Sequence, residues 1–263
     1  MDATSLQATP LSIFLTFILV VISISISYKE KLKLEKDIII AAVRATVQLV
    51  IVGFVLREVF QLDNNLVTMA MIAVILLNAA WNSKHRGAAF KNSFFISLFA
   101  LTLTTVGTLT ILVLIQAIKF QPSQIVPLAG TIAGNSMTAI GLSFSSLENL
   151  YHDNQEKILE KIALGATPRQ ASQRVIRQSI SNGLIPIIDK ARALGIVTFP
   201  GTMNGLLFAG ISPLIAVAYQ IMIIFTQIST ATLSSYLVTI FSYRSLFTDR
   251  AELKNLPKED NNE

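Results

Sequence analysis

Seven long apolar runs, almost free of charged side chains, constrain what this chain can fold into. A helix needs roughly 20 apolar residues to cross a bilayer core of about 30 Å. The candidate spans are 11–28, 38–56, 66–81, 93–118, 122–147, 193–209 and 214–243. Arg44 is the one charged residue inside them. The third and sixth runs are short, so the pattern leaves six, seven or eight spans open.

Composition agrees with an all-α, polytopic membrane protein of about seven transmembrane helices. The mean hydropathy is +0.59 and only 14% of the residues are charged. A soluble helical domain would need polar faces that these runs lack. We expect a single membrane domain over 1–247, with a long polar loop at 148–182 and a disordered tail at 248–263. The chain has no cysteine, which excludes disulfides and thiolate metal sites.

The basic residues predict an orientation, because cytoplasmic loops of membrane proteins are enriched in Lys and Arg. Of the 21 such residues, only Arg57 and Lys119 fall in segments that would be external if the N-terminus is outside, and Arg44 lies within a span. Lys190 and Arg192 are counted here with the long loop. The protein is therefore expected in the plasma or inner membrane, with the loop and the C-terminal tail in the cytoplasm.

The 148–182 loop has the pattern of two short amphipathic helices. Gly165 is suited to end the first helix, because glycine is favoured at helix C-termini. Thr167 can cap the second helix and Pro168 fits its first position, so the second is expected from Arg169 to Ile180. Such a basic helical loop could lie on anionic headgroups or dock into a cytoplasmic partner, and the pattern alone leaves both open.

Several stretches of the chain resemble the FetB-type iron-export permeases and the related plant aluminium-tolerance permeases. The matching stretches are YKEKLKLEKDIIIAAVRATVQLVIVGFVL (28–56), NAAWNSKHR (78–86), PLAGTIAGNSMTAIGLS (127–143), LGATPRQAS (164–172) and FPGTMNGLLFAGISPLIAVAYQIMI (199–223). The resemblance implies the permease half of an ABC exporter, with two permease copies around two ATPase subunits. It departs from the general permease signature, since Glu160 precedes Gly165 by five positions.

By this resemblance the loop contacts the ATP-binding subunit through Glu160, Leu164, Gly165, Ala166, Thr167, Pro168 and Arg169. The sequence has no GxxxxGK[ST] phosphate loop. We therefore expect no enzymatic activity and no catalytic residue in this chain, with ATP and Mg on the partner. The cargo implied is iron or another metal, although the plant relatives leave a nucleotide sugar open.

Polar and thioether side chains inside the spans are the candidates for a translocation path. They are Arg44, Gln48, Asn78, Asn135, Met137, Met203 and Asn204. Two GxxxG patterns, at Gly130/Gly134 and Gly201/Gly205, predict close helix packing; the alternative is that these helices bend as a path opens. The two histidines, His85 and His152, form no cluster in the sequence, so metal ligands stay unknown.

Two other functions fit the composition. A secondary transporter driven by an ion gradient would usually place acidic residues at mid-membrane, and the spans carry none. A scaffold that does not transport would use the basic loop only to bind lipid.

Overall fold

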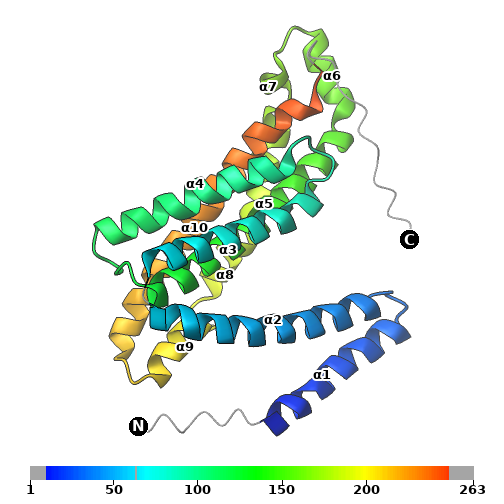
Figure 1. Ribbon diagram of the computed structural model, residues 1–263. Coiled ribbons are helices and arrows are strands. Elements are labelled where there is room, and N and C mark those ends of the chain that lie inside the picture. The colour runs from blue at the N-terminus through cyan, green and yellow to red at the C-terminus, as the bar shows by residue number, and fades with distance from the viewer. Residues whose placement is uncertain (1–9, 63, 249–263) are drawn as a thin grey trace.

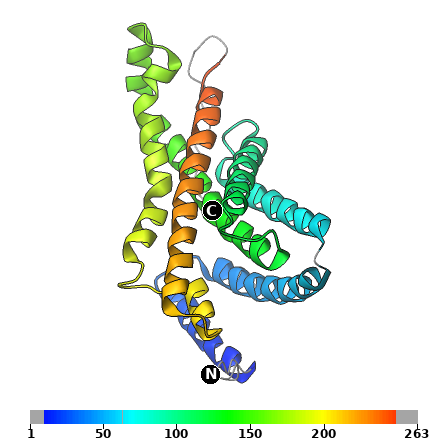
Figure 2. The ribbon, with the colours of Figure 1, turned by 90° about the vertical axis from the view of Figure 1, so that its left-hand side faces the viewer.

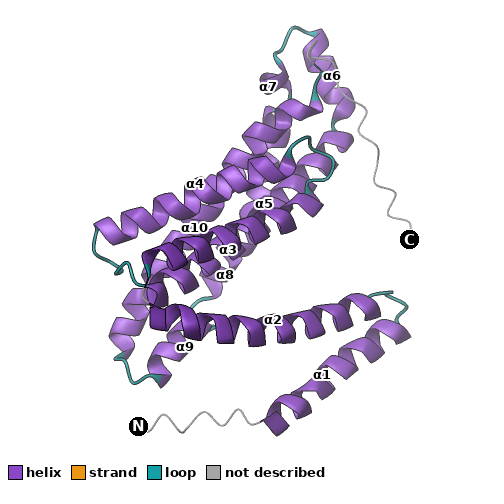
Figure 3. Cartoon of the chain, in the orientation of Figure 1, coloured by secondary structure: helices purple, strands orange, loops and turns teal. Residues whose placement is uncertain are grey.

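The computed structural model describes residues 10–62 and 64–248, and this part of the chain is helical without strands (Figure 3). The long helices are α1 (Pro10–Lys29), α2 (Glu35–Leu62), α3 (Asn65–Arg86), α4 (Ser93–Leu114), α5 (Pro122–Asp153), α8 (Gln173–Ala193) and α10 (Pro213–Ser242). Shorter helices are α6 (Gln155–Ala163), α7 (Pro168–Ala171), α9 (Gly201–Phe208) and η2 (Tyr243–Leu246). The predicted fold class, an all-α polytopic membrane protein, is confirmed. The predicted tail lies outside the described residues, apart from Thr248.

The long helices run back and forth between two ends of the molecule (Figure 1). We call the end with α6 and α7 the loop end, and the end with the 115–121 and 209–212 turns the turn end. The helices α2, α3, α4, α5 and α10, the last extended to Leu246, are long and apolar enough to span a membrane, and Leu15–Lys29 is a shorter apolar segment. The helix α10 returns the chain to the loop end, where η2 follows it.

The sixth predicted span is wrong in its position. Residues 193–209 do not form one helix, because α8 ends at Ala193 and α9 begins only at Gly201. Most of the sixth passage between the two ends is made by α8, which we had expected to be a short loop helix ending at Ile180. Residues 194–208, which include α9, complete it toward the turn end. The composition of α8 is too polar to resemble a span. Protein contacts with α5 and α10 nevertheless cover one of its faces (Figure 2), and neighbours of this kind make a polar helix tolerable at membrane depth.

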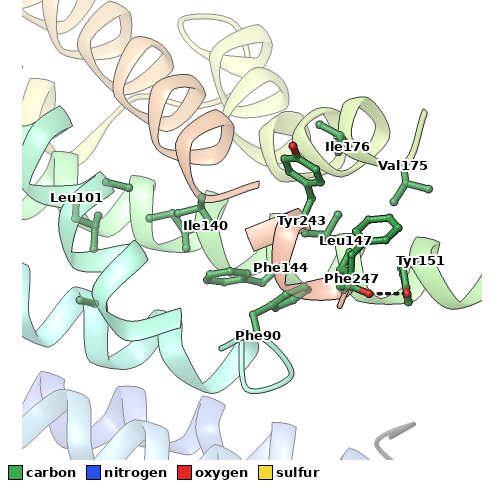
Figure 4. Packing of buried hydrophobic residues seen from close by; sticks show 14 of the residues in the cluster. Phe90, Leu101, Ile140, Phe144, Leu147, Tyr151, Val175, Ile176, Tyr243 and Phe247 are labelled. Carbon is green, nitrogen blue, oxygen red and sulfur yellow. Dashed lines mark hydrogen bonds between the residues drawn. The ribbon is translucent and has the colours of Figure 1, made fainter. Parts of the chain in front are cut away.

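The main hydrophobic cluster lies around the loop-end half of α5 (Figure 4). Phe144 and Leu147 on α5 are fully buried, and the Phe144 ring stacks on Phe90 with centroids 5.3 Å apart. The Tyr151 hydroxyl donates to the carbonyl oxygen of Leu246 at 3.0 Å. These contacts attach the loop and the end of α10 to the same core, so the loop is a fixed extension of the bundle.

The α1–α2 hairpin stands apart from this core (Figure 2). In the most apolar stretch of α2 no residue is buried within the chain. Contacts of α2 with α3 and α5 are few. Most of the surface of α2 is therefore left to lipid or to another chain.

Candidate functional site

The tip of the loop is a tight turn between α6 and α7. Ile158 anchors α6 in the main cluster with 1% of its surface exposed. The Gly165 amide donates to the Ile162 carbonyl and the Ala166 amide to the Lys161 carbonyl, both at 2.9 Å. Gly165 has φ +90°, in the left-handed region that favours glycine. The predicted glycine terminus is therefore confirmed.

The second half of the turn is fixed by a capping box. The Gln170 amide donates to Thr167 Oγ1 at 3.4 Å, and the Thr167 amide donates to Gln170 Oε1 at 2.9 Å. Pro168 occupies the first turn of α7, where its missing N–H costs nothing. The predicted cap is confirmed, but the helix that it begins is not continuous: α7 ends at Ala171 and α8 starts at Gln173.

The turn presents an apolar side chain to its surroundings. Leu164 is 87% exposed, although leucine is normally buried. Glu160 and Arg169 are exposed on either side of it, and Ala166 packs against the main cluster. Nothing lies within 4 Å of where a Gly165 side chain would begin. An exposed leucine on a rigid turn is a suitable anchor for a pocket on another protein.

A basic groove runs beside the turn. It has a volume of about 410 Å³ and contains no acidic side chain. Its lining residues are Lys161, Gln170, Gln173, Arg174, Arg177, Gln178 and Ser181. The loop therefore offers a partner both an apolar anchor and a positively charged surface.

Below the loop, α8 lies very close to α5 and α10. A Cβ on Gly183 would meet Ser143 Oγ, and would lie 2.8 Å from the carbonyl oxygen of Ala139. The Asn182 side-chain Nδ2 donates to Ser146 Oγ at 2.7 Å. This close packing of α8 on α5 was missed from the sequence. We looked for pairs of glycines four residues apart, and Gly183 has no such partner.

The α5–α8 contact leaves a small cavity farther from the loop, of about 110 Å³ and open at the surface. Asn135 and Thr138 line it from α5, and Pro186 and Lys190 from α8. Asn135 donates one amide hydrogen to the Thr131 carbonyl at 2.8 Å. Of the path residues suggested by the sequence, only Asn135 lies here. Lys190 was missed because we counted it with the cytoplasmic loop. It lies on α8 beside this cavity, so it is no longer counted among the residues that predict the orientation.

The other predicted path residues are not brought together in the chain. Arg44 and Gln48 are exposed on α2, away from the cavity. Asn78 accepts from Asn82 Nδ2 at 2.6 Å along α3. Met137 packs against the main cluster. The remaining two, Met203 and Asn204, are half-buried on α9.

The GxxxG glycines are not close-packed within the chain. A Cβ added to Gly130, Gly134, Gly201 or Gly205 would have no atom within 4 Å. The packing predicted for them is therefore not found inside a single copy. In the described residues there is also no group of three His, Cys, Asp or Glu side chains that could hold a metal ion.

These features define a helical, polytopic membrane protein with a rigid loop at one end. The chain belongs to the uncharacterised protein family UPF0014, whose model matches residues 10–247. It is 45% identical over 242 residues to the probable iron export permease protein FetB of Escherichia coli, covering 92% of this chain and 93% of that protein.

Two further relatives share most of the chain. The UPF0014 membrane protein YjkA of Bacillus subtilis is 34% identical over 93% of this chain and 98% of its own length. The Arabidopsis thaliana protein ALUMINUM SENSITIVE 3 is 30% identical over 90% of this chain and 87% of its own length. No solved structure matches the chain.

Proposed function

We propose that this chain is the membrane permease subunit of an ABC exporter for iron or another metal ion, and that a separate subunit hydrolyses ATP. The similarity to a probable iron export permease over nearly the full length supports the permease role. The observation that carries the coupling role is the turn at 164–169, which combines an exposed Leu164, a left-handed Gly165 and a capped α7.

The loop end is proposed to face the cytoplasm, with the N-terminus outside. The basic residues support this, because the groove at the loop end contains Lys161, Arg174 and Arg177, whereas the turn end has Lys119 in its 115–121 turn. Proteins of this kind retain Lys and Arg on the cytoplasmic side. In this orientation the turn can reach a soluble ATPase that binds ATP and Mg.

The exporter is proposed to contain two copies of this chain. The uncovered surfaces support a second copy, since α2 is almost bare and the Gly130/Gly134 face of α5 is open. Small residues on such a face allow another helix to approach closely.

The test is co-purification of the tagged permease with an ABC-type ATPase from its own cells, together with ATP-dependent metal efflux. Leu164→Ala is expected to lower both several-fold, because the anchor of the contact is removed. Leu214→Ala is the matched control, since Leu214 is 82% exposed at the turn end. Bulky replacements of Gly165 and Ala166 should also release the ATPase. If all these variants kept a stoichiometric complex and full transport, the coupling role would be wrong.

A further inference from the structure

The last turns of α8 lie near the middle of the membrane. Asn135 on α5 shares a cavity with Lys190. With a helical rise of about 1.5 Å per residue, Asn135 lies about 20 Å along α5 from Pro122, the first residue of that helix. Ile224, which packs with Ile187, is about 16 Å along α10 from Pro213. Both helices therefore place these turns near the centre of a core of about 30 Å.

Three charged side chains are found at this depth. The Asp189 and Arg192 side chains are 60% and 78% exposed and form an ion pair at 3.4 Å. Lys190 is also exposed. Asp189 is paired with Arg192, so Lys190 keeps an uncompensated positive charge there.

Charge at mid-membrane is stable only against water or protein. The neighbouring surface of α5 is suited to water, because Thr131, Asn135 and Thr138 form a polar stripe along it. Water along this stripe would hydrate the charged end of α8, as expected if both border the translocation path.

The sign of the charge indicates the kind of cargo. We propose that the cargo passes this point as an anion, namely a metal complex whose carboxylate or phosphate ligands give it net negative charge. The Lys190 ammonium and the second amide hydrogen of Asn135 are the donors that meet it. A positive group in a narrow, low-dielectric path attracts anions and repels free cations. A second copy would add the same charge.

This inference rests on the proposed function, because it names the cargo of that exporter. It is tested separately, by the reactivity of a single cysteine. The chain has no cysteine of its own, so Thr138→Cys places one thiol in the cavity. The full-length chain in membranes is labelled with an anionic and with a cationic methanethiosulfonate of similar size. Ser212→Cys is the reference position, since Ser212 is exposed and its side chain caps nothing.

The ratio of the anionic to the cationic labelling rate is measured at Thr138→Cys and divided by the same ratio at Ser212→Cys. We expect the result to exceed one, because the anionic reagent should react faster at Thr138→Cys. Adding Lys190→Gln should lower this preference at least about tenfold, because a unit charge a few ångströms away in a medium of intermediate dielectric changes the local concentration of an ion by more than that. Lys190→Arg should keep the preference, and Lys161→Gln, in the distant groove, should not change it. Equal rates with both reagents, or no labelling by either, would overturn the inference.

Transport supplies the second measurement. Cells loaded with ⁵⁵Fe and carrying Lys190→Gln should export it several-fold more slowly while the ATPase still co-purifies, and Lys190→Arg should restore efflux. Normal efflux with Lys190→Gln would also overturn the inference. If the unmodified chain did not co-purify with an ATPase, the proposed function would be contradicted instead. The labelling ratio would still decide the charge of the path.

Discussion

A Cβ on Gly183 would lie 2.8 Å from the carbonyl oxygen of Ala139. Because that oxygen belongs to the backbone of α5, the contact cannot be relieved by turning a side chain. The absence of a side chain at Gly183 is thus what lets the polar helix α8 lie against α5 and α10 as part of the bundle.

We expect Gly183→Ala to lower the stability of the purified protein. Forcing a methyl group into this contact costs roughly 1–3 kcal/mol, as overpacking usually does. Gly107→Ala is the matched control, because Gly107 is also helical and has open space around it. Alanine should be neutral or slightly stabilising there. The apparent unfolding temperature in detergent measures both, and equal temperatures for the two variants would contradict the α5–α8 packing.

The Thr104–Ser234 hydrogen bond, 2.9 Å long and buried, should contribute measurably to the contact of α4 with α10. Thr104 already donates to the Ala100 carbonyl at 2.8 Å, so Ser234 is the donor across the interface. A double-mutant cycle with Thr104→Val and Ser234→Ala should give a coupling of about 0.6 kcal/mol, the average for hydrogen bonds between membrane helices.

Thr232→Val is the control for this cycle. Its hydroxyl bonds the Ile228 carbonyl of its own helix and is exposed. It should therefore show no coupling with Thr104→Val. A coupling of zero between Thr104 and Ser234 as well would mean that the two helices are not held by this pair.

Features that depend on a few neighbouring residues could be predicted from the sequence, whereas features that depend on contacts between helices could not. Gly165 and Thr167 were assigned correctly, because a glycine terminus and a capping threonine act within one turn of the chain. The identity of the sixth passage was not predictable in this way. In α8, Asn182 and Lys190 give the composition of a surface loop, and only the contacts of Gly183 with two other helices reveal where it lies. Arg44 and Gln48 do share a face, but no pattern in α2 says which way that face points.

Thr167→Ala should loosen the turn without weakening the bundle. Loss of an N-cap costs about 1 kcal/mol, and α7 has only one turn to absorb it. Trypsin cleavage at Arg169 should therefore become about fivefold faster, while the unfolding temperature of the whole protein stays unchanged. Thr167→Ser keeps the hydroxyl and should be cleaved at the original rate. A uniform rate in all three proteins would show that the capping box does not hold the turn.

The position of the sixth passage can be tested by labelling from the two sides of the membrane. If α8 crosses from the loop end, the segment after it lies between mid-depth and the turn end, and Val197→Cys should react with an impermeant maleimide from outside. Val197 is 76% exposed, so its thiol would not be hidden by the chain itself. Leu164→Cys should react only from the cytoplasm. Had residues 193–209 formed the span, Val197 would lie near its cytoplasmic end. Labelling of Val197→Cys only from the cytoplasm would therefore restore that assignment and remove α8 from the membrane.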